Sequence, residues 1–232
     1  MPATAPAFAS TRPPPERRAR TTGNACTSDA CNGAGVCVHP ATPGVPCADD
    51  GDLCTADACD SAGDCVHPAV PAVGCRPAAK SSLLIKNSSD DSKDRLTWKW
   101  LKGAATTLAE LGLPTDTTRY AFCLYSGTSA ASVGLPAGAK WQTSGTTGYK
   151  FTDPSSSPDG AKKALLRSGA AGKAKVLVKG KGSNLPDSPA PALSLPVTAQ
   201  LVNDANAVCF EAVYDQAAVI TNDATQFKAK AD

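Results

Sequence analysis

Two copies of one cysteine-rich unit lie in tandem near the start of the chain, and they restrict its fold more than any other feature. Residues 26–47 and 54–75 each read C-x4-C-x5-C-x9-C, and they align without gaps with 15 of 22 positions identical. Few large apolar side chains occur in this stretch, so burial alone cannot offset the entropy lost on folding. Covalent cross-links are therefore expected to stabilise it.

The cysteine count agrees with a disulfide framework. The chain has 10 cysteines, an even number, and such a density in a loop-rich region is typical of proteins from oxidising compartments. We expect pairing inside each copy, although four cysteines allow three connectivities. An extracellular or cell-surface location follows, with the periplasm as one export route. The cysteines expected in disulfides are Cys26, Cys31, Cys37, Cys47, Cys54, Cys59, Cys65, Cys75, Cys123 and Cys209.

Two metal-binding alternatives compete with this interpretation. Each copy contains C-x4-C-x5-C-x-H, ending at His39 or His67, but paired zinc ligands usually lie two to four residues apart. Disulfides are therefore favoured over zinc. Calcium is the one cofactor left open, because carboxylates gather around the second copy. The calcium candidates are Asp49, Asp50, Asp52 and Asp57, although Asp also initiates turns and the spacing does not match an EF-hand.

Charge divides the chain into an acidic and a mildly basic part. Residues 21–75 hold seven Asp and no Lys or Arg, whereas residues 80–232 hold 18 basic and 13 acidic side chains. Neither part has the basic density of a nucleic-acid surface, and no apolar stretch reaches the ~20 residues of a membrane span. Residues 1–25 are predicted to form a flexible basic leader in which Ala7-Phe8-Ala9 resembles a signal-peptide cleavage site.

The second domain is predicted to be an antiparallel β-sandwich or jelly roll over residues 83–232, after a Pro/Ala-rich linker at 76–82. Apolar and polar residues alternate there, as in Leu96, Trp98 and Trp100 on one strand face. The best helix candidate, 104–111, is cut short by glycine and proline. Strands are predicted over 83–85, 96–101, 118–126, 147–152, 162–168, 173–180, 195–203, 206–215 and 224–230.

Two cysteines lie in the middle of predicted strands of this domain. Cys123 alternates with Phe122 and Leu124, so it points to the opposite, outer face, and the pattern around Cys209 places it likewise. We expect a cross-strand disulfide between Cys123 and Cys209, with two buried thiols as the alternative.

Catalytic motifs are scarce in the second domain. It contains no histidine, which excludes a Ser-His-Asp site and a histidine zinc motif within it. A carboxylate pair such as Glu211 with Asp215 could in principle act as in a glycosidase, although positions i and i+4 on one strand are expected to be ordinary solvated residues.

Two sets of residues suggest binding instead of catalysis. Lys173, Lys175, Lys179 and Lys181 share one face of a predicted strand and suit an anionic glycan. The more conservative interpretation is an edge strand that its lysines protect from mispairing. Three tryptophans, Trp98, Trp100 and Trp141, suit a sugar-stacking platform, although a core position is the commoner role for such residues.

The second copy carries a recognisable pattern, C-A-D-D-G-D-L-C-T-A-D-A-C-D-S-A-G-D-C-V-H, over residues 47–67. It resembles tandem cysteine-rich repeats of secreted bacterial proteins, which are loosely similar to the cysteine-rich region of Dickkopf-like proteins. The first copy departs from this pattern, because Ala19 occupies the position of the leading cysteine. The second domain, with segments such as LTWKWLKG and AVCFEAVY, resembles an uncharacterised module that accompanies such repeats. The resemblance implies an extracellular setting and no catalytic residues.

Together these features predict a secreted, non-catalytic surface or matrix protein. Its β-sandwich is expected to serve adhesion or recognition, with an anionic glycan or another cell-surface component as partner, and the repeats are expected to form a disulfide-stapled stalk. The alternative is an extracellular polymer hydrolase that uses carboxylates of the second domain.

Overall fold

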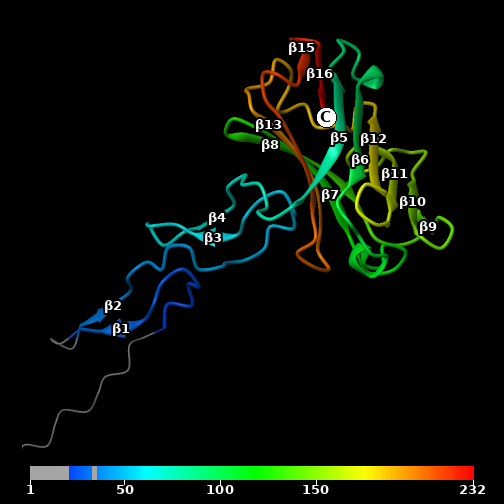
Figure 1. The fold of residues 1–232 in the computed structure, drawn as a ribbon. Coiled ribbons are helices and arrows are strands. Elements are labelled where there is room, and N and C mark those ends of the chain that lie inside the picture. The colour runs from blue at the N-terminus through cyan, green and yellow to red at the C-terminus, as the bar shows by residue number, and fades with distance from the viewer. Residues whose placement is uncertain (1–20, 33–35) are drawn as a thin grey trace, which may run out of the picture. The chain divides into compact units, whose positions relative to one another are not determined.

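The computed structural model describes residues 21–32 and 36–232 (Figure 1). Most of the predicted basic leader, including the cleavage-site pattern at residues 7–9, lies outside the described residues. The chain divides into two compact units: residues up to Ala48 with Asp57–Val66, and Asp49–Ala56 with His67–Asp232. None of the helices among the described residues has the length and apolar character needed to cross a bilayer.

The first unit consists of two short hairpins of the same design. In one, β1 (Ala30–Cys31) pairs with β2 (Cys37–Val38), and in the other, β3 (Ala58–Cys59) pairs with β4 (Cys65–Val66). The register is the same, since Cys31 lies opposite Cys37 and Cys59 lies opposite Cys65. The sequence repeat is therefore also a structural repeat.

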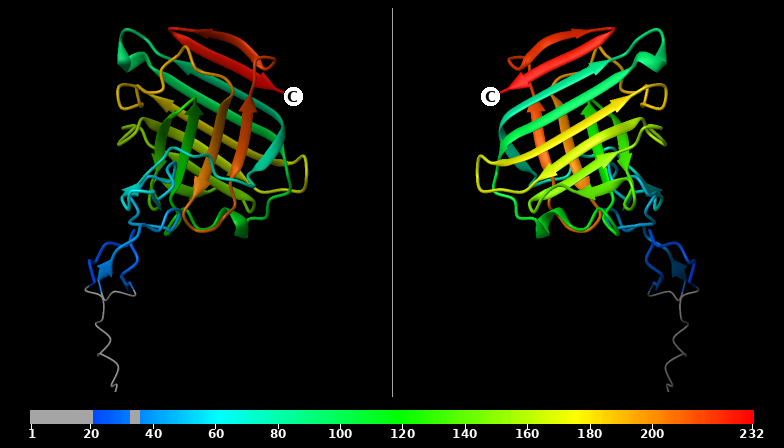
Figure 2. Two further views of the ribbon diagram at one scale, coloured as in Figure 1. Left: turned by 90° about the vertical axis from the view of Figure 1, so that its left-hand side faces the viewer. Right: turned by 90° about the vertical axis from the view of Figure 1, so that its right-hand side faces the viewer.

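The second unit is built from two β-layers (Figures 1 and 2), and the prediction of a mainly β fold is confirmed. One layer has the strand order β8–β7–β13–β14, and the other has β16–β5–β6–β12–β11–β10–β9 with β15 beside β16. The strands are β5 (Arg76–Lys86), β6 (Arg95–Gly103), β7 (Tyr120–Ser126), β8 (Ser129–Leu135), β9 (Trp141–Thr143), β10 (Gly148–Thr152), β11 (Ala161–Arg167), β12 (Ala174–Lys181), β13 (Val197–Asn203), β14 (Phe210–Tyr214), β15 (Val219–Asp223) and β16 (Gln226–Ala231).

The two layers form one curled sheet because the start of β5 continues the first layer. There Arg76 and Pro77 pair in parallel with Phe210 and Glu211 of β14, whereas the other strand pairs are antiparallel. Further along, β5 pairs with β6 on one side and with β16 on the other. Figure 2 shows the strands of the two layers crossing each other.

The hydrophobic core lies between the layers and is rich in aromatic rings. Trp98 and Trp100 of β6 are fully buried, and Trp141 is 3% exposed. Trp98 packs on Phe122 of the opposite layer, with 5.4 Å between the ring centroids. The sugar-stacking interpretation of the three tryptophans is therefore wrong, since their rings are enclosed by apolar neighbours.

Each predicted strand overlaps an observed one, and the differences are local. β8, β9 and β15 have no counterpart among the predicted strands. For β8, the reason is that residues 129–135 consist mainly of small side chains and directly follow a turn signal. Residues 76–82, expected as a linker, are the first part of β5. Of the helix candidate 104–111, the final turn is a 3-10 helix, η2 (Ala109–Leu111), and a second such turn is η1 (Asp91–Lys93).

An ion pair fastens the η2 turn to the start of β5. Arg76 Nη2 lies 2.6 Å from Glu110 Oε1, and the backbone N–H of Thr107 donates to Glu110 Oε2 at 2.7 Å. The hydrogen bond from Arg76, followed by those from Thr107, lowers the pKa of Glu110 to about 2. The ionised carboxylate of Glu110 therefore stabilises the fold at pH values above the pKa of about 4.3 that a glutamate has in the unfolded chain.

This pair predicts an acid dependence of stability. The pKa of Glu110 is lower in the folded state, so its contribution is lost as the pH falls from about 4.5 towards 2. We expect Glu110→Gln to be less stable than wild type at neutral pH, with the difference shrinking across this window. Urea unfolding followed by tryptophan fluorescence at several pH values measures it. A difference that does not change with pH would contradict the assignment.

Candidate anion-binding face and its covalent support

The disulfides do not close within the copies as expected. Cys26 of the first copy bonds to Cys59 of the second, and Cys47 bonds to Cys65. The expectation of pairing inside each copy is therefore wrong. The reason is the hairpin geometry: Cys59 and Cys65 lie side by side on β3 and β4, where they meet the chain of the preceding copy.

The predicted bond between Cys123 and Cys209 is also wrong. Cys123 bonds to Cys54 and Cys209 bonds to Cys75, so both bonds connect the β-layers to the second cysteine-rich copy. The prediction that Cys123 faces away from the core of Phe122 is confirmed, because Cys123 packs with Cys54 in a separate buried cluster. That outer face is covered by residues of the second copy, which bring the actual partner cysteines.

Polar contacts reinforce this covered face. Gln200 of β13 is fully buried; its Nε2 donates to the carbonyl oxygen of Ala72 at 2.8 Å, and its Oε1 accepts from the Ala72 N–H at 2.9 Å. Tyr125 donates its hydroxyl to the carbonyl oxygen of Cys54 at 3.0 Å, and burial raises the pKa of Tyr125 to about 12. A glutamine in the middle of the apolar run VTAQLVN was the available sequence signal for this contact.

The bonds follow one rule along the chain. The first and fourth cysteines of the first copy bond to the second and third cysteines of the next copy. The first and fourth cysteines of the second copy bond in turn to Cys123 and Cys209. The first and fourth cysteines of each copy thus form bonds to the chain that follows that copy.

The expectation of a fifth disulfide is not met. Cys31 and Cys37 are thiols in the structure, and their Sγ atoms lie 3.9 Å apart on neighbouring strands. Desolvation and the adjacent Cys37 raise the pKa of the Cys31 thiol. Four disulfides are nevertheless the pattern of an extracellular or secreted protein.

Three of the four calcium candidates shape turns in the structure. Carboxylate oxygens of Asp49, Asp50 and Asp52 accept hydrogen bonds from backbone N–H groups two residues ahead, as turn-forming Asp residues do. Four of the six cysteines in the two zinc motifs, Cys26, Cys54, Cys59 and Cys65, are in disulfides. His39 Nδ1 lies 2.6 Å from Asp29 Oδ1.

The carboxylate pair considered for hydrolysis is also engaged elsewhere. Glu211 Oε2 accepts a hydrogen bond from Gln200 Nε2 at 2.6 Å, beneath the second copy. Asp215 Oδ1 accepts from the backbone N–H groups of Ala217 and Ala218, which shapes the turn before β15.

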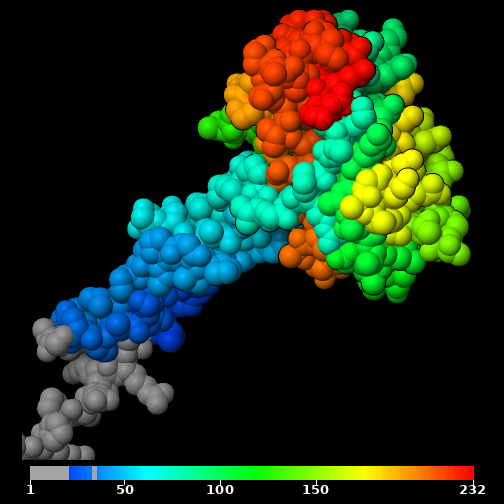
Figure 3. All heavy atoms as spheres, viewed as in Figure 1, coloured from blue at the N-terminus to red at the C-terminus, as the bar shows by residue number. Residues whose placement is uncertain are grey.

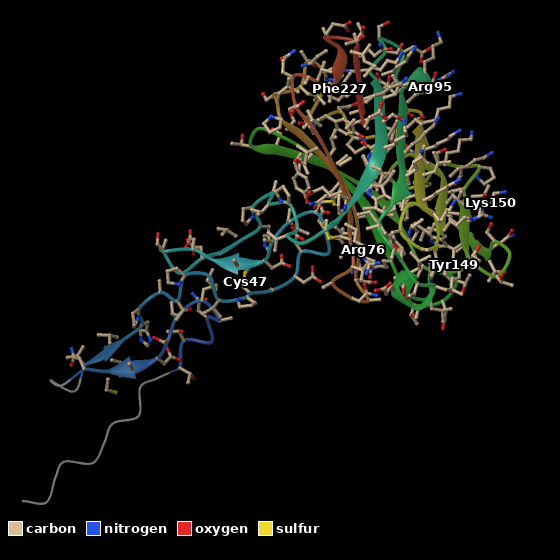
Figure 4. All side chains as sticks on the ribbon, viewed as in Figure 1. Cys47, Arg76, Arg95, Tyr149, Lys150 and Phe227 are labelled. Atoms are coloured by element: carbon tan, nitrogen blue, oxygen red, sulfur yellow. A yellow bond between two sulfur atoms is a disulfide. The ribbon has the colours of Figure 1, made fainter. Side chains whose placement is uncertain are left out.

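Cations cover the outer face of the second layer, which we call the basic face. β5, β6, β9, β10, β11, β12 and β16 contain no Asp or Glu. Figure 3 shows the atoms of the cyan, green and yellow segments of this layer next to one another at the surface. The register places the outward-facing cations of these strands on one surface, and Figure 4 shows Arg95 and Lys150 on the side away from β7 and β13. These cations are Lys80, Lys86, Arg95, Lys99, Lys150, Lys163, Arg167, Lys175, Lys179, Lys181, Lys228 and Lys230.

Several of these cations lie directly opposite one another. Arg95 pairs with Lys86 on one side and with Lys181 on the other, so three neighbouring strands carry a row of positive charge. Lys163 likewise faces Lys179 across β11 and β12. Like charges in directly opposed positions destabilise a sheet, so folding alone does not account for them.

The structure corrects the edge-strand interpretation of the lysine strip. β12 pairs with β6 and with β11, so it lies inside the layer and needs no protection from mispairing. Lys175, Lys179 and Lys181 are on its outer face, whereas Lys173 lies in the turn before the strand. Whether β12 is an edge strand depends on the order of strands in the sheet, and the local sequence pattern does not reveal that order.

Comparison with known proteins identifies the repeats. Residues 23–41 and 47–69 match the family described as Dictyostelium (slime mold) repeat. The tandem cysteine-rich repeat is thereby shown, whereas the Dickkopf-like and bacterial parts of the expected resemblance receive no support. The chain matches no curated protein and no solved structure.

Proposed function

We propose that this protein is a secreted, non-catalytic recognition protein that binds an acidic glycan of a cell surface or matrix through the basic face. The observation that carries the proposal is the row of Lys86, Arg95 and Lys181 on adjacent strands. Such a row lowers stability, and local departures from folding rules are concentrated at functional sites. A negatively charged ligand relieves the repulsion between these cations.

The character of the face favours a glycan over a nucleic acid. All Trp, Tyr and Phe side chains among the described residues are buried, so they offer no rings on which bases can stack. Outward hydroxyl groups of Ser82, Thr97 and Thr152 lie between the cations and suit hydrogen bonds to sugars. The four disulfides agree with an extracellular setting, where acidic polysaccharides are common polyanions.

The cysteine-rich repeats provide covalent support for this function. Two disulfides attach the second copy to the layer opposite the basic face, through Cys123 and Cys209. Both bonds end on the first layer, whose strands β7, β8, β13 and β14 contain no Lys or Arg. The repeats act as a protease-resistant spacer.

Binding to defined polyanions tests the proposal. The oxidised full-length protein is expected to bind dextran sulfate or polygalacturonate, with an affinity that falls as salt increases, and not to bind neutral dextran. Replacement of two cations of the face, Lys99→Gln with Lys175→Gln, is expected to weaken binding by about threefold or more. Isothermal titration calorimetry at two salt concentrations measures both effects.

The matched control removes two cations outside the face, Lys102→Gln with Arg119→Gln, and is expected to leave the affinity unchanged. Arg119 pairs with Asp204 at the surface, and exposed pairs of this kind contribute little to stability. An equal loss in both double variants would mean that net charge alone attracts the polymer. Absence of binding to both acidic polymers would refute the proposal.

A further inference from the structure

One part of the basic face is a hollow rather than a flat surface. Arg95, Lys162, Lys163, Lys179 and Lys181, from β6, β11 and β12, surround a shallow depression; we call these five cations and their depression the bulge site. Thr97 also lines it, and no carboxylate does. Positive charge is thus concentrated at one place on the face.

A β-bulge creates this concentration. In β11, Ala161 pairs with Gly180 and Lys163 pairs with Lys179, so Lys162 is an extra residue without an opposite partner on β12. A bulge redirects side chains and is common beside functional sites. Here it brings two consecutive lysines to the rim of one hollow, whereas regular alternation would send them to opposite faces.

The charges of the bulge site are not neutralised within the protein. None of its five cations forms an ion pair in residues 21–32 and 36–232. The carboxylates that flank these strands in sequence are bound elsewhere: Asp94 accepts from the Ser88 N–H, Asp153 from Lys140, and Asp159 from the Gly134 N–H. The site is therefore available to an external anion.

We propose that the bulge site binds a tetrahedral oxyanion ester, a sulfate or phosphate group, carried by the polymer that the basic face recognises; this inference rests on the proposed function. A monoester of this kind presents three terminal oxygens, one more than a carboxylate. Lysine and arginine N–H donors from three strands line the hollow. The planar guanidinium group of Arg95 can donate two parallel hydrogen bonds to such oxygens. The site therefore selects sulfated or phosphorylated polymers over those that carry carboxylates alone.

The test compares two double variants that remove the same charge. Lys163→Gln with Lys179→Gln changes the bulge site, and Lys99→Gln with Lys175→Gln changes the face outside it. The probes for the oxidised full-length protein are dextran sulfate, dextran bearing phosphate monoesters (dextran phosphate) and polygalacturonate. The bulge-site variant is expected to lose about tenfold or more in affinity for at least one of the first two polymers, and the matched variant much less. For polygalacturonate, the two variants are expected to lose affinity equally.

The outcomes separate this inference from the proposed function. A selective loss for dextran sulfate identifies a sulfate ester, and a selective loss for dextran phosphate identifies a phosphate monoester. Equal losses in both variants for all three polymers would overturn the bulge site but leave the basic face as a polyanion surface. No binding by wild type would overturn both. Thermal unfolding checks the fold, and the bulge-site variant is expected to melt no lower than wild type, because one opposed lysine pair is removed.

Discussion

Replacing Cys75 and Cys209 together by alanine is expected to lower the free energy of unfolding by about 4 kcal/mol. The bond joins residues separated by 134 positions, and loss of so distant a cross-link increases the entropy of the unfolded chain. It also loosens the second copy from the outer face, where Gln200 binds the backbone of Ala72. Urea unfolding followed by tryptophan fluorescence measures the loss, since the tryptophans are in the β-layer core.

The matched control removes the other two cysteines, Cys31→Ala with Cys37→Ala. Cys31 is exposed and Cys37 half-exposed, and no disulfide joins them. The control is therefore expected to change the free energy of unfolding of the β-layers by less than about 0.5 kcal/mol. Equal effects in the two double variants would contradict the assigned pairing.

Trp100→Ala is expected to cost about 3–5 kcal/mol, because a fully buried ring leaves a large cavity. The ring packs edge-on against Phe210, and its Nε1–H points at the carbonyl oxygens of Arg76 and Glu211, each at 3.1 Å. Those two strands form the parallel pair at which one layer passes into the other. Trp100→Phe keeps most of the apolar contact and loses the donor, so its cost is expected to be about 1–2 kcal/mol.

A glycine beside this ring provides an independent check. A Cβ added at Gly103 would lie 1.8 Å from Trp100 Cη2, so Gly103→Ala alone is expected to be strongly destabilising. In the Trp100→Ala background the overlap disappears, and the same change is expected to cost little more. A double-mutant cycle of unfolding free energies measures this coupling. Additive costs would contradict the assigned contact.

The basic face has a cost that the rest of the structure must offset. Four opposed like-charge pairs lie on it: Lys86 with Arg95, Arg95 with Lys181, Lys163 with Lys179, and Arg167 with Lys175. Each such pair disfavours the sheet by a few tenths of a kcal/mol or more. The aromatic core and the long-range disulfides supply stability from elsewhere in the unit. The residues that stabilise the unit are therefore separate from the cations of the proposed recognition surface.

Local pattern was enough to predict most strands of the second unit and one strand face of the candidate site. Alternation placed Lys175, Lys179 and Lys181 on one face of a strand and Cys123 opposite Phe122, because side-chain direction in a strand depends only on position. The repeat and its cysteine count likewise indicated an oxidising compartment. These properties follow from neighbouring residues alone.

The disulfide partners and the full basic face depend on tertiary structure. Cys54 bonds to Cys123 because the second copy covers the outer face of β7 and β13, a contact between segments far apart in the chain. Lys86, Arg95 and Lys181 form a row because β5, β6 and β12 are neighbours in the sheet. Periodicity sets where a side chain points within its own strand. Which strands and cysteines meet depends on how the layers pack, and that packing decided both the covalent framework and the site.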